Sequence, residues 1–489
     1  MSIPSPIGLP QELKLGEVDY SLPGDARSYS VNVQPSNISQ VQQTGISLIC
    51  AASAAPTTLP QFSSQTLFFD LPAGSSPSTF IDNRFTTLSF RANVSITTAV
   101  TASSITSAFQ RSGGYSWFDR MYITAQNGNI IEDITEFGLV NDLMVATQLN
   151  PATRDSLAVQ YGFLSDPAAT VAQGHQWTTI VGGAAVTATE TYSYSIPLSS
   201  SVVGVLADRF FNIGRTNKLQ IALQTATELP ISILCSATAA AAGAMTVTLS
   251  DFAIQCQYVD VGPTALAMLD ATLPDKKAYI HGTSYKTSSI SMPAVAGTQS
   301  LLAGIRGSSI KSLFARFQDL GTQSTTNSIN GKYDSKNPNI NSINFNVGGQ
   351  RLPNNPVNPL LNPSRAFRAL QMASGSFNNA TFQSCMIPAS YCKLAAGGTA
   401  QAATVGGTQA YYWNLGSVQT ALCQFIYGED LEVVARRGLM SGMNCNSAPV
   451  FVEFNVASAP TNAQTLYVHA LGDVVYIHDV ATGDVQVRM

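Results

Sequence analysis

Charged side chains are scarce in this chain. They make up 11% of its 489 residues, against roughly 25% in an ordinary soluble domain. The formal net charge is −4, and the only cations among the first thirty residues are Lys14 and Arg27. This excludes an arginine-rich arm that grips nucleic acid. Neutral small and polar residues take the place of the charged ones, namely Ser, Thr, Asn, Gln, Gly and Ala. Such a composition is typical of a surface that is largely buried against other copies of the same protein.

Cysteine pairs and long apolar runs are also lacking. The seven cysteines are odd in number and form no Cys-x-x-Cys pair, so we expect small buried hydrophobes in a reducing compartment. No apolar run reaches the roughly eighteen residues of a membrane span, and no charged segment followed by an apolar one opens the chain. The sequence therefore predicts a soluble protein made inside a cell.

Histidine is rare, which limits the catalytic arrangements that the chain could hold. The four histidines are His175, His281, His469 and His478. A Cys445–His469 pair for nucleophilic catalysis is conceivable, but buried cysteines and strand histidines are far more common. The segment 469–480 holds two His and two Asp, and its alternating pattern favours a strand over a metal site.

Other chemical signatures are missing too. The chain has no Gly-x-Ser-x-Gly elbow, Walker A, GxGxxG or EF-hand pattern. Glu132 and Glu136 are one helical turn apart and are expected to be solvated on the outer face of a helix. The pairs Lys276-Lys277 and Arg436-Arg437 fit a solvated rim better than a phosphate site. We name no catalytic, cofactor-binding or metal-binding residue, and expect no enzyme and no cofactor.

Period-two alternation is the main positive signal. In 87–96, every second residue from Leu88 to Ile96 is apolar and the others are polar or charged, as in a half-buried strand. The same pattern recurs at 192–196, 219–223, 245–249, 252–258, 343–347 and 450–456. Short strands separated by Gly, Pro, Asn and Ser clusters predict an all-β sandwich or barrel.

Two helices are predicted, at similar places in the two halves of the chain. The first spans 131–147, with acidic residues in its early turns. The second starts at Ser364 as N-cap and ends before Gly375. A strand with a turn dipeptide precedes each, Asn127-Gly128 and Gly348-Gly349 respectively. This repeated order, offset by about 220 residues, is what a duplicated domain leaves behind.

The predicted connector between the halves is 261–282, which carries Pro, Asp and Lys residues. Long loops are predicted at 150–188, 236–245, 321–341 and 395–410.

Two strand-rich halves with an inserted helix each resemble the double jelly-roll major capsid proteins of icosahedral double-stranded DNA viruses. The run SSIKSLFARF (308–317) is similar to a segment of their second jelly roll. The segments 421–456 and 465–489 resemble the C-terminal portion of capsid proteins from virophages, polinton-like viruses and the giant-virus lineage. The strand, Asn-Gly turn and helix of 119–147 is similar to theirs as well.

The resemblance implies two tandem eight-stranded jelly-roll sandwiches, each with one inserted helix. It divides the chain into an N-terminal arm (1–35), jelly roll 1 (36–262) and jelly roll 2 (263–489). It also implies a homotrimer of pseudo-hexagonal outline that tiles a virion shell. The implied partners are other copies of the chain, neighbouring capsomers, penton and minor or cement proteins, and an internal membrane if the shell has one. Sequence-specific nucleic acid is not among them.

Three other interpretations stay open at this point. A vertex or fibre protein should show one jelly roll or a long repetitive shaft. A carbohydrate-binding β-sandwich should show clustered exposed aromatics, whereas Trp117, Trp177 and Trp413 are dispersed. A glycosidase needs two carboxylates at a defined separation, which a sequence does not reveal.

The capsid interpretation also implies assembly in the host cytoplasm, a viral factory or the nucleus.

Overall fold

The computed structural model describes the greater part of the chain. The described residues are 26–50, 62–98, 104–109, 112–125, 128–149, 151–162, 177–181, 186–216, 218–235, 241–319, 332–333, 335, 337–377, 386, 391, 413–415, 418–420, 425–432, 440–460 and 462–488.

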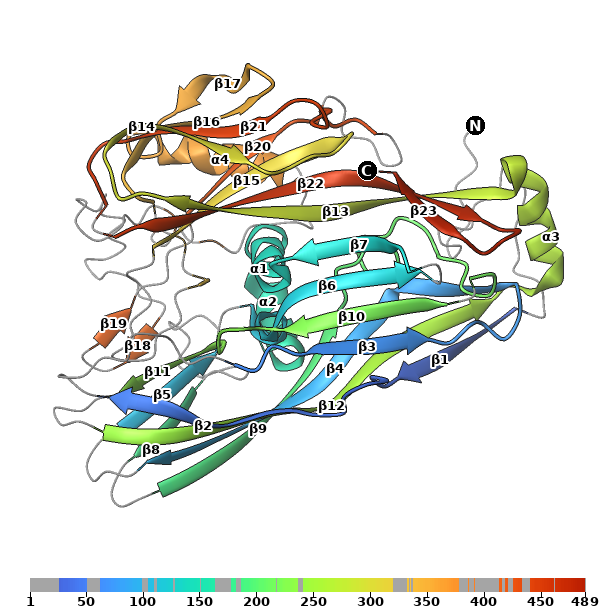
Figure 1. Ribbon diagram of the computed structural model, residues 1–489, viewed down its shortest axis with the longest axis horizontal. Coiled ribbons are helices and arrows are strands. Elements are labelled where there is room, and N and C mark those ends of the chain that lie inside the picture. Colours follow the sequence, from blue (N-terminus) through green and yellow to red (C-terminus); the bar gives the residue numbers. More distant parts are fainter. Residues whose placement is uncertain are drawn as a thin grey trace.

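The first half of the chain forms a sandwich of two antiparallel sheets, in the lower part of Figure 1. One sheet has the order β1-β12-β4-β9 with β2 also on β12, and the other has the order β3-β10-β6-β7. The bounds are β1 Arg27–Val33, β2 Val41–Cys50, β3 Thr66–Leu71, β4 Thr79–Thr98, β6 Phe118–Ala125, β7 Ile130–Thr135, β9 Val186–Pro197, β10 Leu219–Thr225 and β12 Ala241–Asp260.

The second half repeats this arrangement above the first (Figure 1). One sheet has the order β13-β22-β15-β20 with β23 on β22, and the other has the order β14-β21-β16-β17. The bounds are β13 Lys277–Met292, β14 Gly297–Ala303, β15 Ile310–Asp319, β16 Ile340–Val347, β17 Gln350–Val357, β20 Ile426–Asp430, β21 Val450–Val456, β22 Gln464–Asp479 and β23 Val485–Arg488.

Both halves are jelly rolls, and their topology is identical. If the eight main strands of each half are numbered along the chain, the sheets have the orders 1-8-3-6 and 2-7-4-5 in both cases, as in two interlocked Greek keys. The fold class predicted from the sequence is thus confirmed. Smaller sheets extend the structure: β5 Ser104–Phe109, β8 Trp177–Val181 and β11 Ile231–Cys235 in the first half, and β18 Trp413–Leu415 with β19 Val418–Thr420 in the second.

The strand alternation predicts the buried faces well. Leu88, Phe90, Ala92 and Val94 of β4 are all buried. The apolar patterns at 245–249 and 252–258 belong to one strand, β12, and not to two. The backbone of Asp251 is left-handed (φ 55°), and the register with β4 shifts between Ser250 and Ala253. This bulge moves the inward-facing positions by one residue.

The helices differ from the prediction in number and extent. The first jelly roll carries two, α1 (Phe137–Gln148) and α2 (Pro151–Tyr161), where the sequence predicted one helix and then a loop. The predicted start at 131 is wrong because 131–135 belong to β7. The second jelly roll carries α4 (Pro363–Ala373), with Asn362 and not Ser364 as N-cap, since its side chain accepts a hydrogen bond from the Arg365 N–H.

The N-terminal boundary and the connector also need correction. The range 27–33 was predicted as arm, but it forms β1, paired with β12 over its whole length; residues 1–25 of that arm lie outside the described residues. The connector contains a helix, α3 (Gly262–Thr272), and a short 3-10 turn, η3 (Pro274–Lys276), before β13 begins at Lys277. A second 3-10 turn, η2 (Gly113–Trp117), precedes β6.

Among the described residues, no helix combines the length and apolar character needed to cross a bilayer. Cys256 and Cys445 are buried, as predicted for the cysteines; the side chains of the other five lie outside the described residues.

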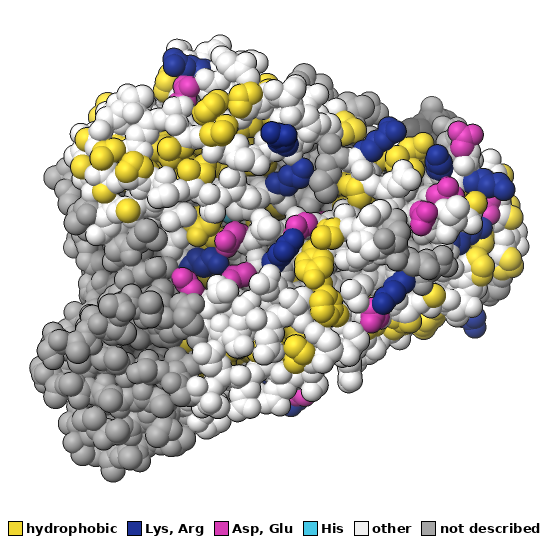
Figure 2. Space-filling model, in the orientation of Figure 1, with side chains coloured by type: hydrophobic (Ala, Val, Ile, Leu, Met, Phe, Trp, Pro, Cys, Tyr) yellow, Lys and Arg dark blue, Asp and Glu magenta, His cyan; other side chains and the backbone are white. Residues whose placement is uncertain are grey.

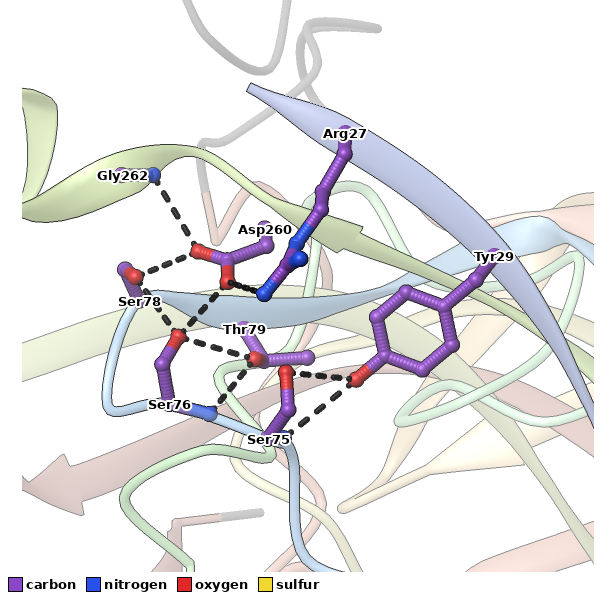
Figure 3. Close-up of polar contacts among 8 residues, drawn as sticks. All are labelled: Arg27, Tyr29, Ser75, Ser76, Ser78, Thr79, Asp260 and Gly262. Atoms are coloured by element: carbon purple, nitrogen blue, oxygen red, sulfur yellow. Dashed lines mark hydrogen bonds and ion pairs between the residues drawn. The ribbon is translucent and has the colours of Figure 1, made fainter. Parts of the chain in front are cut away.

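Asp260 joins three segments at the end of the first jelly roll (Figure 3). Its carboxylate accepts hydrogen bonds from Ser76 Oγ at 2.9 Å, Ser78 Oγ at 2.5 Å and the Gly262 N–H at 3.2 Å. Arg27 of β1 lies 3.8 Å from it. Burial alone would raise the pKa of Asp260, but the hydrogen bonds from Ser78 and Ser76 hold it below its usual value. The last residue of β12 thus fixes β1, the β3–β4 turn and the start of α3.

We expect Asp260→Asn to lower the free energy of unfolding by about 1–3 kcal/mol, because an acceptor carboxylate is lost from a buried cluster. Chemical denaturation at neutral pH would measure this. Asp251→Asn is the matched control: Asp251 is exposed, its ion pair with Arg91 lies between two exposed side chains, and Asn tolerates its left-handed backbone, so a change of less than about 1 kcal/mol is expected. Equal effects of the two variants would contradict the role given to Asp260.

Candidate functional site: the contact between the two jelly rolls

Buried charged and polar side chains gather where the two jelly rolls meet. Figure 2 shows exposed Lys, Arg, Asp and Glu side chains near the middle of one face, and others toward its right-hand end; most of the groups described below are buried beneath the surface. Buried charges are costly unless they are paired or hydrogen-bonded. The partners of each such group therefore show what holds the two halves together.

Glu132 is the centre of the first contact. It lies in β7, is fully buried, and its carboxylate accepts hydrogen bonds from Ser200 Oγ at 2.5 Å and from Ser201 N and Oγ at 2.8 and 2.5 Å. Ser284 of β13, in the second jelly roll, donates a further bond at 3.2 Å. The Tyr476 hydroxyl of β22 lies 2.5 Å from Ser201 Oγ. Because the Ser201 hydroxyl already donates to the carboxylate, Tyr476 is the donor in this bond.

Glu132 was predicted to be solvated on the outer face of a helix, and this is wrong. Its strand lies at the edge of its sheet beside β13, so the side chain enters the contact between the jelly rolls. Burial raises the pKa of Glu132, although the bonds from Ser200 and Ser201 oppose the rise. Burial of this carboxylate is therefore unfavourable by itself, and the hydrogen bonds that compensate for it are donated by residues of both halves.

Arg316 and Asp142 form the second contact. Arg316 lies in β15 of the second jelly roll and Asp142 in α1 of the first, and their side chains are 0% and 1% exposed. Arg316 Nη1 donates to Asp142 Oδ2 at 2.7 Å, and Nη2 donates to the backbone carbonyl of Tyr333. The attraction within a buried ion pair offsets part of the cost of burying its charges, whereas removal of one member leaves the other charge uncompensated.

Lys332 forms the third contact. Its ammonium group lies 2.8 Å from Asp119 Oδ1 on β6 and 2.9 Å from Glu136 Oε2, just before α1. Burial alone would lower the pKa of Lys332, but the carboxylates of Glu136 and Asp119 raise it well above its usual value. The ammonium form is thus favoured. Beside this group, Leu139 of α1 packs with Tyr333 and Tyr467 from the second half.

His478 adds an aromatic contact between the halves. Its ring, on β22, stacks on Phe211 of the first jelly roll with centroids 5.5 Å apart, and Nε2 lies 3.3 Å from Thr216 Oγ1. Burial, assisted by nearby Arg215, lowers the pKa of His478 to about 4. His469, which comes earlier in β22, is also buried: its Nδ1 lies 2.9 Å from Thr287 Oγ1, and burial lowers its pKa to about 3.

The catalytic and metal arrangements weighed from the sequence are not assembled here. His469 bonds to Thr287, while Cys445 Sγ donates to the Met443 carbonyl at 3.7 Å. All of the segment 469–480 except its last residue belongs to β22, as predicted. Within the described part of the chain, no cluster of His, Cys, Asp and Glu is able to hold a metal ion. Lys276 and Lys277 are exposed, and Arg436-Arg437 lies outside the described residues.

The sequence gives little warning of this contact. Arg316 and Asp142 are 174 positions apart. Each lies in a segment that resembles the capsid family (308–317 and 119–147), but nothing in either segment pairs the two residues. Their neighbours are apolar or small, as beside any strand or helix charge. The one hint in the sequence is Arg316, a cation that this charge-poor chain retains among the apolar residues of 313–317.

No protein-family model and no curated protein matches this sequence. Solved structures do match. A chain in the structure of the Sputnik virophage is 12% identical, with a TM-score of 0.53, and the match covers 100% of this chain and 93% of that one. The Faustovirus major capsid protein is 8% identical, with a TM-score of 0.52 and coverages of 94% and 92%.

This chain shares the fold of a viral major capsid protein. The likeness extends over nearly the whole of both chains, so it includes both jelly rolls and not a single sandwich. At such low identity the likeness establishes the fold. It agrees with the double jelly roll that the sequence resemblance implied.

We expect Arg316→Met and Asp142→Leu each to destabilise the protein by about 3–5 kcal/mol, because each removes one member of a buried ion pair and leaves the opposite charge uncompensated. The double variant should recover most of this loss, since a buried ion pair and an apolar pair of similar volume are often equivalent. Denaturant unfolding of the four proteins completes the cycle. A double variant as unstable as the sum of the singles would show that the pair does not couple the halves.

A second expectation concerns acid. Because the folded pKa of His478 is about 4 against 6.5, the unfolded chain binds a proton between these pH values that the folded chain does not. Stability from this group is therefore complete above pH 6.5 and is lost as pH falls toward 4, by about 1.4 kcal/mol per pH unit. Thermal unfolding of His478→Phe and His478→Gln should show a pH dependence reduced by that amount. An unchanged slope in both variants would contradict the assignment.

Proposed function

We propose that the chain is the major capsid protein of an icosahedral double-stranded DNA virus and that it acts as a homotrimer. One observation carries this proposal: the chain holds two jelly rolls of identical topology, joined by buried polar contacts into one body. Three such chains present six similar sandwiches to their surroundings. A protein that must meet six neighbours with threefold symmetry needs a duplicated fold of this kind.

The surface supports the same proposal. Much of the face in Figure 2 is uncharged, with apolar side chains showing between the charged ones, and several apolar side chains are exposed, including Leu361 at 80%, Phe85 at 59% and Leu302 at 57%. The cores of permanent interfaces are apolar and poor in charge. We propose that these areas are covered by other copies of the chain, within the trimer and between capsomers.

The predicted division of the chain is carried forward as part of this proposal. The segment before β1 is proposed as an arm beneath the capsomer, 36–262 with β1 as the first jelly roll, and 263–489 as the second. The proposed partners are neighbouring capsomers, penton and minor capsid proteins, and an internal membrane where the shell has one. The proposed location is the virion shell, assembled inside the host cell. No enzymatic role is proposed.

The carbohydrate-binding alternative finds no support at the one tryptophan that the structure describes in side-chain detail. Trp117 is fully buried beneath Phe62 in the core of the first jelly roll, so its ring does not offer a face to a sugar. The glycosidase alternative is tested separately by an activity screen on glycans.

Light scattering on the purified protein, followed by negative-stain imaging of the same fraction, tests the proposal. We expect a mass near three times 51.7 kDa, about 155 kDa, and particles of hexagonal outline. The mass should not change on dilution, because permanent interfaces of this kind bury more than about 2,000 Å². The same sample unfolded in denaturant supplies the one-chain reference. A stable compact particle of one chain mass would overturn the capsomer proposal.

A further inference from the structure

A cavity of about 580 Å³ lies between the two jelly rolls. One wall comes from α1, α2 and the segment 197–208 of the first half. The other comes from the C-terminal end of α4 and from β15, β20 and β22 of the second half. Its volume falls within the roughly 300–1,000 Å³ of small-molecule sites, which occur preferentially between domains. A ligand held there would touch both halves at once.

Much of the cavity wall is apolar or aromatic. Met144, Leu149 and Leu157 line it from the first jelly roll, and Met372 and Leu471 from the second. Tyr115 and Tyr161 also line it, with ring centroids 6.3 Å apart at an interplanar angle of 75°. An aliphatic chain would pack against such a wall, and the faces of tyrosine rings attract cations.

The charged groups of the wall are mainly acidic. Three carboxylates, Asp208, Asp430 and Glu432, face one ammonium group, that of Lys311, which gives a net lining charge of −2. Lys311 is already committed, since it lies 3.2 Å from Glu432 and 2.9 Å from Asp473.

Asp430 is a carboxylate on which Lys311 acts only at longer range, favouring its charged form without forming an ion pair with it. Within the described part of the chain it has no ion-pair partner, and its side chain accepts one hydrogen bond, from the Glu432 N–H at 3.0 Å. Asp208 likewise has no ion-pair partner among the described residues. Burial and the neighbouring charge of Glu432 raise the pKa of Asp430. A ligand cation beside it would relieve this cost.

We propose that this cavity binds an aliphatic amine, with the methylene chain against the apolar wall and an ammonium group at Asp430. The site lies beyond the capsid role, because it needs only one chain with its two jelly rolls in contact. By touching both halves, the amine would stabilise their contact. The same chemistry is offered by an amine with a single head group and by a linear polyamine, and the second carboxylate, Asp208, distinguishes the two.

The first experiment compares four probes by calorimetric titration and thermal unfolding of the full-length protein at pH 7. Octylamine, octanol and octanoate share a chain and differ in head-group charge, and spermidine carries several ammonium groups. We expect octylamine to bind and to raise the unfolding temperature, octanol to bind at least tenfold more weakly, and octanoate more weakly still. That factor corresponds to about 1.4 kcal/mol, close to the lower end of the values found for a charge-assisted hydrogen bond.

Two variants locate the binding. Asp430→Asn should lower the affinity for octylamine about tenfold or more and leave that for octanol unchanged, because only the head-group charge is lost. Asp251→Asn, on the exposed surface of β12, is the matched control and should change neither. Val205→Trp adds bulk at a cavity-lining residue that is 44% exposed, and it should weaken all bound probes without loss of the fold.

The outcomes separate the alternatives. Tighter binding of spermidine than of octylamine, lost in Asp208→Asn, would identify the ligand class as polyamine; the reverse order identifies a single-headed amine. Equal binding of octanoate and octylamine, an unchanged affinity in Asp430→Asn, or no binding of any probe would overturn the proposal. None of these results depends on whether the protein is a trimer, so failure of this site and failure of the capsid role are distinguishable.

Discussion

The structure depends on one electrostatic constraint: a charge buried between two sandwiches needs a partner from the other sandwich. Arg316 and Asp142 lie in different halves, and each is out of contact with water. Separation of the halves would require both ions to be rehydrated or left alone in an apolar setting. The Glu132 and Lys332 contacts impose the same condition at two further points. These buried groups therefore oppose any independent movement of the two domains.

This constraint also explains why a charge-poor chain keeps the charges it has. Two domains joined by a linker usually move relative to one another. Here buried polar groups fix their mutual orientation, which a purely apolar contact would not do. Hydrophobic contact is non-directional, whereas a guanidinium between a carboxylate and a backbone carbonyl accepts one arrangement. The polar groups thus set the angle between the sandwiches, and the apolar contacts, such as Leu139 with Tyr333 and Tyr467, add to their stability.

How much of this could be predicted from the sequence depends on the range of the interactions. Strands such as β4 were predictable, because alternation is local and one face of each strand is buried. The predicted start of the first helix was too early, because Ile131 and Ile134 are spaced as on one face of a helix. In the structure both are buried residues of the strand β7. Only the pairing of β7 with β6 and the left-handed backbone of Glu136 distinguish this strand from a helix.

The partners of the buried polar groups could not be predicted from the sequence. Ser284 and Tyr476 meet the Glu132 cluster only after two domains have folded and docked, and no local pattern records that event. The bulge at Asp251 could be predicted in part. The sequence shows that the apolar positions change from odd to even numbers there, but this pattern predicts two strands and not one bulged strand.

The two jelly rolls are alike in strand order and unlike in their inserted helices. The first carries α1 and α2 between its fifth and sixth main strands, and the second carries α4 there. In a ring of three chains, the six sandwiches would therefore alternate between two kinds. Such a ring is unchanged by a rotation of one third of a turn but not by one sixth. Each hexagon can then take two different orientations in the shell, which are related by a rotation of one sixth of a turn. The contacts between two adjacent hexagons differ for these orientations, so one of them can be selected without any further protein.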